Sequence, residues 1–374
     1  MNPTQAFEQI VAQQLARTEE MKTAPRPLDF SRLKPIIIGT IGGDGIGPII
    51  TGACREILEK LLAEELAAGA VELRDIPGLT IENRVAKMET VPQDVLEAVK
   101  ECHVFLKGPT TTPGGDDGLP PLESANVRLR KELDLFANLR PVSIPEQQID
   151  WTFFRENTEG EYALGSQGVE IDDDLSIDFK VTTTIGTTRL ARAAFEYARA
   201  NGKDRVSIVT KANIMKKTDG KFLRLCYEVA KDYPEIRTDD WYVDIMSAKL
   251  ISGQNSGFHV FILPNLYGDI LTDEAAQMQG GVGTAGSANI GGRYAMFEAI
   301  HGSAPRMIRE GRGKFANPAS ICRAAVMMLR HIRYSEKADR LESALDQAQA
   351  ALRIQRDGSG DTTADFTEFV ISRV

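Results

Sequence analysis

The sequence predicts an α/β fold, because strand-like apolar runs alternate with helical patterns along most of its 374 residues. Three of the runs, 35–41, 206–210 and 259–263, are almost continuously apolar and rich in β-branched or aromatic residues. Such runs are typical of strands that are covered by helices on both faces. Segments with helical periodicity lie between such runs, and strands that alternate with helices indicate an α/β fold.

The first element expected is a short amphipathic helix within an N-terminal extension, residues 1–34. Ala6, Ile10, Val11, Gln14 and Leu15 have the spacing of one helical face, which we expect to pack on the body. A proline-rich hinge then follows at Pro25 and Pro27. The remaining elements are expected in chain order as strand 35–41, helix 48–68, strands 71–76 and 103–107, an exposed loop at 114–121, helix 125–133, strand 151–154, a hairpin or arm at 168–184, helix 187–201, strand 206–210, helix 219–231, strand 259–263 and helices 318–333 and 336–352.

Charge and composition exclude several classes of function. The net charge of -9 argues against a nucleic-acid partner, which needs a basic surface. An anionic substrate must therefore be attracted by a local basic cluster. The four cysteines are scattered, as in a cytoplasmic protein with reduced thiols, and no stretch has the length of a membrane span. Acidic residues near the N-terminus disfavour a mitochondrial transit peptide.

The glycine-rich segment 42–48 follows the first strand and opens a helix, where a dinucleotide fingerprint would stand. It does not fit G-x-G-x-x-G, because the sixth position counted from Gly43 is Pro48. We interpret it as a tight strand-to-helix turn with Pro48 in the first helical turn.

An acidic pair, Asp269 and Asp273, lies four residues apart in NLYGDILTDEAA. On a helix these carboxylates share one face, where their repulsion is relieved by a hard cation such as Mg²⁺ or Mn²⁺. A solvated acidic face is the alternative that the pattern alone leaves open.

Three arginines, Arg130, Arg140 and Arg155, each stand at the end of an apolar element. Arginine is suited to bidentate recognition of carboxylates, so the trio predicts a polycarboxylate substrate. Surface ion pairing with nearby acids remains the alternative for each arginine alone. Lys211 follows the strand 206–210, at the edge where open α/β folds place their sites. Tyr162 ends RENTEGEY, and His301 precedes a Gly-Ser turn.

Taken together, these segments resemble the isocitrate and isopropylmalate dehydrogenases, a family of β-decarboxylating dehydrogenases. The resemblance covers about residues 35–370 and rests on GDGIGP, KGPTTTP, SANVRLRKELDLFANLRPV, RENTEGEY, KANIMK, NLYGDILTDEAAQMQGGVGTAGSANIG, EAIHGSAP and ANPAS. It implies the family's two-domain fold, which is not a Rossmann fold, with a large cofactor-binding domain (35–135 and 280–374) and a small domain for substrate and dimerisation (136–279). An arm at about 163–184 is expected to act as a clasp in a homodimer with shared active sites.

The resemblance also assigns expected roles to individual residues. The catalytic acid–base pair falls on Tyr162 and Lys211, with the lysine reaching the site of the partner subunit. The substrate carboxylates fall on the three arginines, with Ser124, Asn126 and Asn213 beside them. The metal ligands, for Mg²⁺ or Mn²⁺, fall on Asp269, Asp273 and, from the partner chain, Asp244. Cofactor contacts fall on Thr112, His301, Gly302, Ala304 and Asn317.

Ser124 and Asn126 favour isocitrate among the family's substrates. Isopropylmalate enzymes usually carry leucines at this stretch, and a buried polar group facing an alkyl chain would cost about 1–3 kcal/mol. Homoisocitrate is the nearest rival. A catalytically silent regulatory subunit, a second class found in the family, typically lacks one of the catalytic or metal residues, all of which are present here.

NAD is favoured as the cofactor over NADP. NADP-specific relatives tend to have Lys-Tyr after HGTAP, and a tyrosine and an arginine near the C-terminus, where this chain has Ala364 and Glu368. Glu368 would repel a 2′-phosphate. Arg306 departs from both patterns, because NAD-specific relatives usually carry an acid there.

Overall fold

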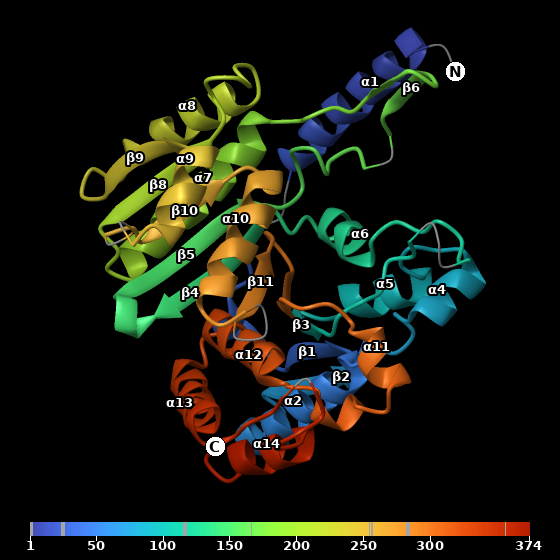
Figure 1. Cartoon of the computed structure of the whole chain (residues 1–374), viewed down its shortest axis with the longest axis vertical. Coiled ribbons are helices and arrows are strands. Elements are labelled where there is room, and N and C mark those ends of the chain that lie inside the picture. The colour runs from blue at the N-terminus through green and yellow to red at the C-terminus, as the bar shows by residue number, and fades with distance from the viewer. Residues whose placement is uncertain are drawn as a thin grey trace. The chain divides into compact units, whose positions relative to one another are not determined.

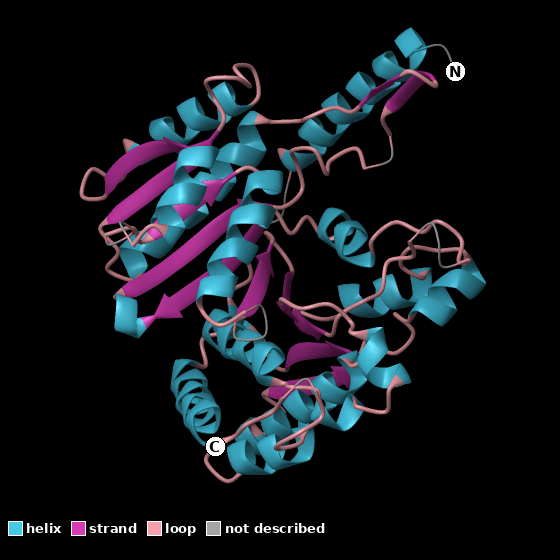
Figure 2. Cartoon of the chain, viewed as in Figure 1, coloured by secondary structure: helices cyan, strands magenta, loops and turns pink. Residues whose placement is uncertain are grey.

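The computed structural model describes residues 3–23, 27–114, 118–165, 167–253, 255, 257–281, 285–355 and 357–374. Helices and strands alternate along the chain, so the predicted α/β class is confirmed (Figures 1 and 2). The chain forms two compact units: Met1–Arg26 with Phe136–Gln279, and Pro27–Leu135 with Gly280–Val374. Pro25 and part of the loop at 114–121 lie outside the described residues.

The unit of residues 27–135 and 280–374 is built on strands in the order β2-β1-β3-β12-β11. Neighbouring strands are parallel except for β11 and β12, which are antiparallel. The strands are β1 (Ile36–Ile41), β2 (Val71–Asp75), β3 (Val104–Lys107), β11 (Gly286–Ile290) and β12 (Ala295–Ala299). The glycines Gly286 and Gly291 permit close packing there, because a Cβ on either would collide with neighbouring backbone.

Nine α-helices accompany this sheet: α2 (Gly47–Leu61), α3 (Ala63–Ala67), α4 (Ile81–Lys87), α5 (Gln93–Lys100), α6 (Ala125–Glu132), α11 (Pro305–Arg309), α12 (Ala319–His331), α13 (Ser335–Ala351) and α14 (Thr363–Ile371) among the described residues. Apolar side chains of α5 and α6 pack with Phe105 and Met296 of the sheet in one core. Helix α12 packs on β3, β11 and β12 and also contacts α2. Short 3-10 helices lie at Phe30–Arg32 and Gly313–Phe315.

The unit of residues 1–26 and 136–279 carries strands in the order β4-β5-β10-β8-β9. Strands β4 and β5 are antiparallel, and the pairs β5/β10, β10/β8 and β8/β9 are parallel. The strands are β4 (Ala137–Ile144), β5 (Ile149–Glu156), β8 (Arg205–Thr210), β9 (Arg237–Tyr242) and β10 (Val260–Leu263), with a 3-10 helix at Pro145–Gln147 between β4 and β5.

Helices cover both faces of this second sheet, which explains why its central strands read as continuous apolar runs. In β10, Val260 and Ile262 face α7 (Thr184–Ala200) and α8 (Asp219–Ala230), whereas Phe261 and Leu263 face α9 (Val243–Ile251) and α10 (Asn265–Met278). Successive side chains of a strand point to opposite faces, so every position of β10 is buried.

The N-terminal helix is longer than the sequence predicts. Helix α1 (Pro3–Met21) has 19 residues and packs on the first strand of the arm, which consists of β6 (Val169–Asp172) and β7 (Leu175–Ile177). Ile10 is buried as expected, but Val11 and Leu15 are exposed. The prediction that these residues form one face packed on the body is therefore wrong in part, because the narrow arm covers only one side of the helix.

The structure also tests the expected positions of Arg140, the cysteines and any membrane-spanning helix. Arg140 lies in the middle of β4 rather than at the end of an element, because the strand runs on through Pro141 to Ile144. All four cysteines are buried and free, as predicted. Among the described residues, no helix is both long and apolar enough to cross a membrane.

Candidate functional site

The carboxyl ends of three neighbouring parallel strands, β1, β3 and β12, meet at one edge of the sheet in the unit of residues 27–135 and 280–374. The turn after β1, the loop after β3 and the loop after β12 are joined by hydrogen bonds. The Thr111 amide donates to Asp44 Oδ2 at 2.7 Å, and the Thr111 and Ser303 hydroxyls are 2.8 Å apart. Residues that are 67 and 192 positions apart in the sequence therefore form one loop cluster.

The glycine-rich turn is a tight strand-to-helix connection, as interpreted from the sequence. Gly45 has a φ of 59°, and a Cβ there would lie 2.0 Å from the Ser303 carbonyl oxygen. Glycine is therefore required by both conformation and space. Helix α2 begins at Gly47 with proline in its first turn.

The predicted cofactor residues lie around this loop cluster. Thr112 follows β3, His301, Gly302 and Ala304 follow β12, and Asn317 precedes α12. His301 Nδ1 lies 3.0 Å from the Gly302 carbonyl oxygen, and Asn317 Oδ1 accepts a hydrogen bond from the Ala319 amide at 2.9 Å. Their contact with a cofactor stays a prediction.

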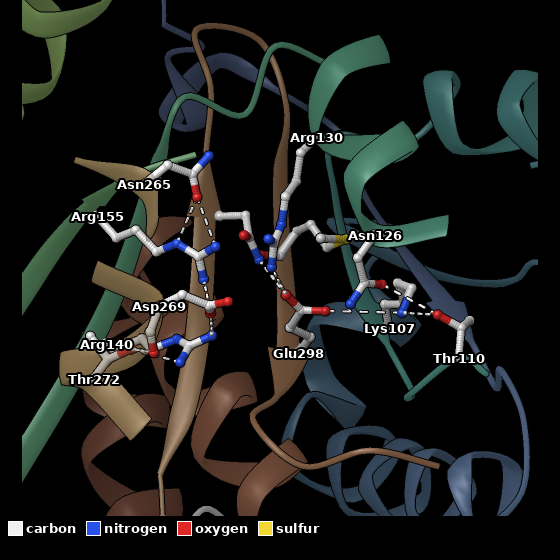
Figure 3. Close-up of polar contacts among 12 residues, drawn as sticks. Lys107, Thr110, Asn126, Arg130, Arg140, Arg155, Asn265, Asp269, Thr272 and Glu298 are labelled. Atoms are coloured by element: carbon white, nitrogen blue, oxygen red, sulfur yellow. Dashed lines mark hydrogen bonds and ion pairs between the residues drawn. The ribbon is translucent and has the colours of Figure 1, made fainter. Parts of the chain in front are cut away.

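Arg130 belongs to a buried polar network in the same unit (Figure 3). Its Nη2 donates to Glu298 Oε1 at 3.1 Å, and Lys107 Nζ lies 3.9 Å from Glu298 Oε2. Lys107 also donates to Thr110 Oγ1, which lies 3.4 Å from Asn126 Oδ1. The network therefore connects Asn126 and Arg130, both predicted substrate residues, through side chains of β3, β12 and the loop after β3.

Burial and charge set the ionisation of this network. Burial lowers the pKa of Lys107 to about 8, against the opposing influence of Glu298. Burial alone would raise the pKa of Glu298, but Arg130 and Lys107 outweigh it and hold that pKa below its ordinary value. Sequence analysis missed Lys107 and Glu298 because nothing local signals that parallel β3 and β12 place them together.

Arg140 and Arg155 lie on the antiparallel strands β4 and β5 and reach the same helix, α10 (Figure 3). Arg155 donates to Asn265 Oδ1 from Nε at 3.0 Å and from Nη2 at 2.7 Å, and Nη1 pairs with Asp269. Arg140 Nη1 donates to Thr272 Oγ1 at 2.7 Å and to Asp273 Oδ1 at 2.6 Å. Two of the three predicted metal-binding aspartates, Asp269 and Asp273, are thus each joined to a predicted substrate-binding arginine.

Tyr162 joins the same cluster. Its hydroxyl donates to Asp269 Oδ2 at 2.9 Å, and the Arg155 guanidinium lies 5.4 Å from its ring centre. Gly268, in the first turn of α10, makes room for this arrangement, because a Cβ there would lie 2.5 Å from Arg155 Cγ. The structure therefore assembles Arg140, Arg155, Tyr162 and the acidic pair around one turn of one helix.

Lys211 and Asp244 form a separate pair, with Lys211 Nζ 2.5 Å from Asp244 Oδ1. The hydrogen bond and charge of Lys211 lower the pKa of Asp244. Asn213 is exposed in the turn after Lys211, and the Lys211 amide donates to Asp219 Oδ2 at 2.8 Å. Within the described part of the chain, no group of three or more His, Cys, Asp or Glu side chains is placed to hold a metal ion.

Comparison with known proteins matches residues 37–370 to the isocitrate/isopropylmalate dehydrogenase family. The chain is 36% identical to regulatory subunit 2 of the mitochondrial NAD isocitrate dehydrogenase of Arabidopsis thaliana, over 96% of this chain and 94% of that protein. It is 38% identical to catalytic subunit 5 of the same plant's enzyme, over 91% of this chain and 89% of that protein.

A solved structure of the same family has a similar fold. The isocitrate dehydrogenase from Methylococcus capsulatus has a TM-score of 0.78 to this chain and is 34% identical, covering 90% of this chain and 98% of its own. Regulatory and catalytic subunits match almost equally well, so overall similarity does not separate these two roles.

Proposed function

Because the chain belongs to the isocitrate/isopropylmalate dehydrogenase family, we propose that it oxidises and decarboxylates isocitrate to 2-oxoglutarate with reduction of NAD. One observation carries the catalytic part of this proposal. Arg140 and Arg155 are each joined to an aspartate of α10, and the Tyr162 hydroxyl donates a hydrogen bond to the aspartate that pairs with Arg155. The cluster therefore contains two arginines that can bind a carboxylate, two aspartates that can bind a metal ion and a tyrosine that can donate a proton. A catalytic subunit requires all three kinds of group.

The α10 carboxylates fit a divalent metal ion. Asp269 and Asp273 are one helical turn apart, their side chains are 37% and 58% exposed, and both present the hard oxygen donors that Mg²⁺ and Mn²⁺ prefer. We assign Asp269 and Asp273 of this chain, with Asp244 of the partner subunit, as its ligands. When bound, the ion supplies Lewis-acid polarisation of the substrate oxygen.

The chain's own side chains supply the remaining chemistry. Arg140 and Arg155 hold substrate carboxylates, and the Nε atoms of Arg130 and Arg140 are buried with no hydrogen-bond partner among the described residues, so each retains a donor. Oxidation of the secondary alcohol requires that its hydroxyl proton be removed, a role we assign to Lys211 from the partner subunit. Tyr162 then protonates the carbon that has lost CO₂.

Two residues near Arg130 support isocitrate over isopropylmalate. Ser124 stands at the start of α6, where its side chain makes no capping hydrogen bond, and Asn126 lies one turn before Arg130. Both are partly exposed and polar, which suits a third carboxylate. Facing an alkyl group they would lose about 1–3 kcal/mol per unpaired polar group.

A surface cavity of about 770 Å³ supports NAD. It lies between the first turns of α2 and helix α14, and its lining includes Glu56, Lys314, Ala364 and Glu368. Glu56 and Glu368 outweigh Lys314 in this lining and leave it with a net negative charge, which disfavours a 2′-phosphate by repulsion. The Arg306 side chain is 79% exposed, and its Nε donates to Glu310 Oε1 at 2.5 Å.

A substrate panel tests the proposed reaction. Isocitrate, homoisocitrate, isopropylmalate, malate and tartrate are each assayed with Mn²⁺ and NAD. Isocitrate is expected to give the highest kcat/KM, and EDTA is expected to abolish its turnover. Good turnover of isopropylmalate without turnover of isocitrate would overturn the substrate assignment. Absence of turnover with every substrate would instead favour a regulatory subunit.

The cofactor assignment has its own test. The wild type is expected to prefer NAD in kcat/KM, and Glu368→Gln is expected to improve NADP more than NAD because it removes repulsion of the 2′-phosphate. Glu101→Gln, which neutralises a carboxylate of the same unit that is 69% exposed and lies outside the cavity lining, is the matched control. A strong preference of the wild type for NADP would contradict the assignment.

A further inference from the structure

We propose that Arg17, on the N-terminal helix α1, is a positioning residue for the segment that carries Tyr162 and that it acts through the buried carboxylate of Glu159. Arg17 lies outside residues 37–370, which the family model matches. Its effect on catalysis rests on the proposed function, whereas its effect on the segment 156–162 does not.

Helix α1 is anchored where it can deliver Arg17. Ile10 packs with Leu164 and Val169 in a small core at the base of the arm. The rings of Phe7 and Phe179 are 5.6 Å apart, and Figure 1 shows α1 running along β6. These contacts fix the helix on the arm, two turns before Arg17.

The carboxylate that Arg17 contacts is almost completely buried, with 2% of its side chain exposed. Arg17 Nη2 donates to Glu159 Oε1 at 2.9 Å, and the Thr183 amide donates to Oε2 at 2.8 Å. Thr183 is the N-cap of α7, and a Cβ on Gly186 would lie 2.4 Å from Glu159 Oε1, so the carboxylate rests on the first turn of that helix.

A second buried carboxylate makes a cation at this point more important. Glu156 accepts hydrogen bonds from the Thr158 and Glu159 amides, and burial together with the charge of Glu159 raises its pKa. Leaving a buried carboxylate without its partner is strongly unfavourable. Loss of Arg17 would therefore push the turn at 156–159 toward solvent or toward a different hydrogen-bond arrangement.

A chain of hydrogen bonds connects this turn to the candidate active site. Asn265 Nδ2 donates to the Glu159 carbonyl oxygen at 2.9 Å. Asn265 Oδ1 accepts from Arg155, whose guanidinium pairs with Asp269, the acceptor of the Tyr162 hydroxyl. A shift of Glu159 is therefore transmitted both along the backbone to Tyr162 and through Asn265 to Arg155.

The experiment compares three variants of the full chain. Arg17→Met removes the charge, Arg17→Lys keeps it, and Lys22→Met removes a charge just beyond the same helix, where Lys22 pairs with exposed Glu19. Hydrogen exchange of segment 156–162 is measured without substrate, and kcat and KM are measured with isocitrate. We expect Arg17→Met to speed exchange in this segment about tenfold and to lower kcat about tenfold, because small misplacements of catalytic groups cost that much or more. Lys22→Met should match the wild type, and Arg17→Lys should recover most of both effects.

Two outcomes overturn the inference. One is exchange in 156–162 that is the same in Arg17→Met as in Lys22→Met. The other is an equal increase in the buried strand β8, which lies two strands from β5 in the sheet, because that result would mean general destabilisation. Because exchange is read without substrate, a wild type that does not turn over isocitrate contradicts only the proposed function and leaves the Arg17 result interpretable.

Discussion

Lys180 and Asp219 form a buried ion pair whose removal should destabilise the unit of residues 136–279 strongly. Lys180 Nζ lies 2.6 Å from Asp219 Oδ1, with side-chain exposures of 6% and 0%. Burial lowers the pKa of Lys180, but its close contact with Asp219 outweighs burial and raises that pKa. Glu161 lies 3.2 Å away, and the ring centre of Tyr267 lies 4.4 Å from the ammonium group.

The perturbation is Asp219→Asn, which keeps the shape of the side chain and removes its charge. Removing one partner of a buried pair costs about 3–5 kcal/mol, and Glu161 with Tyr267 should keep the loss near the lower end, about 3 kcal/mol. Glu228→Gln is the matched control on the same helix, α8, because Glu228 and Lys231 are 56% and 67% exposed. An exposed pair of this kind contributes less than about 1 kcal/mol.

Tryptophan fluorescence during urea unfolding is the assay. Both tryptophans of the chain, Trp151 and Trp241, belong to the unit that contains Asp219, so their signal follows that unit. We expect a lower midpoint at an unchanged slope for Asp219→Asn. In a double-mutant cycle, adding Lys180→Met should cost little more, because the partner charge is already unpaired. A loss for Asp219→Asn no larger than that for Glu228→Gln would refute the reasoning.

Three further predictions concern other parts of the chain. Lys107 has its pKa lowered to about 8 in the folded protein, so between about pH 8 and 10.5 the unfolded chain binds more protons and the free energy of unfolding rises with pH. The rise should reach up to about 3 kcal/mol relative to Lys107→Met, measured by denaturant unfolding of both proteins at pH 7.5 and 10.5. The same change between these pH values in both proteins would contradict the prediction. Gly268→Ala should raise the KM for isocitrate about tenfold or more, because its methyl group displaces Arg155, and an unchanged KM would show that Arg155 can move without loss. Lys211→Met should abolish turnover while leaving the circular dichroism spectrum and Tm close to those of the wild type, and a near-normal kcat would remove Lys211 from the mechanism.

The fold was predictable where burial imposes a simple pattern on the sequence. Strand β10 is covered on both faces, so its residues are all apolar, and the turn after β1 needs glycine for both its conformation and its space. The family resemblance supplied the two-domain fold, which the structural similarity confirms. The length of α1 and the place of Arg140 within β4 were misjudged, because a largely exposed helix carries a weak periodic signal and Pro141 interrupts the apparent strand after Arg140.

The candidate site was predictable only where its members are close in sequence. Asp269 and Asp273 are one helical turn apart, so their common face follows from periodicity. The contacts of Glu298 with Arg130 and of Asn265 with Arg155 span 168 and 110 residues and depend on which strands are neighbours. Pattern analysis gives the residue types of a site, whereas strand order determines which of them meet.

Together with the proposed function, the pairing of arginines with aspartates on α10 predicts that substrate and metal bind cooperatively. A substrate carboxylate held by Arg140 and Arg155 competes with Asp273 and Asp269, which currently neutralise those guanidinium groups. The released aspartates repel each other unless a divalent cation takes their charge, so each ligand should strengthen the binding of the other equally. We expect isocitrate to bind at least about tenfold more tightly with Mn²⁺ than without it, a coupling of about 1.4 kcal/mol, when titrated calorimetrically in the absence of NAD. Sodium chloride at matched ionic strength is the control, and Asp273→Asn should reduce the coupling. Equal affinities with and without Mn²⁺ would mean that the ion pairs on α10 persist when the substrate is bound.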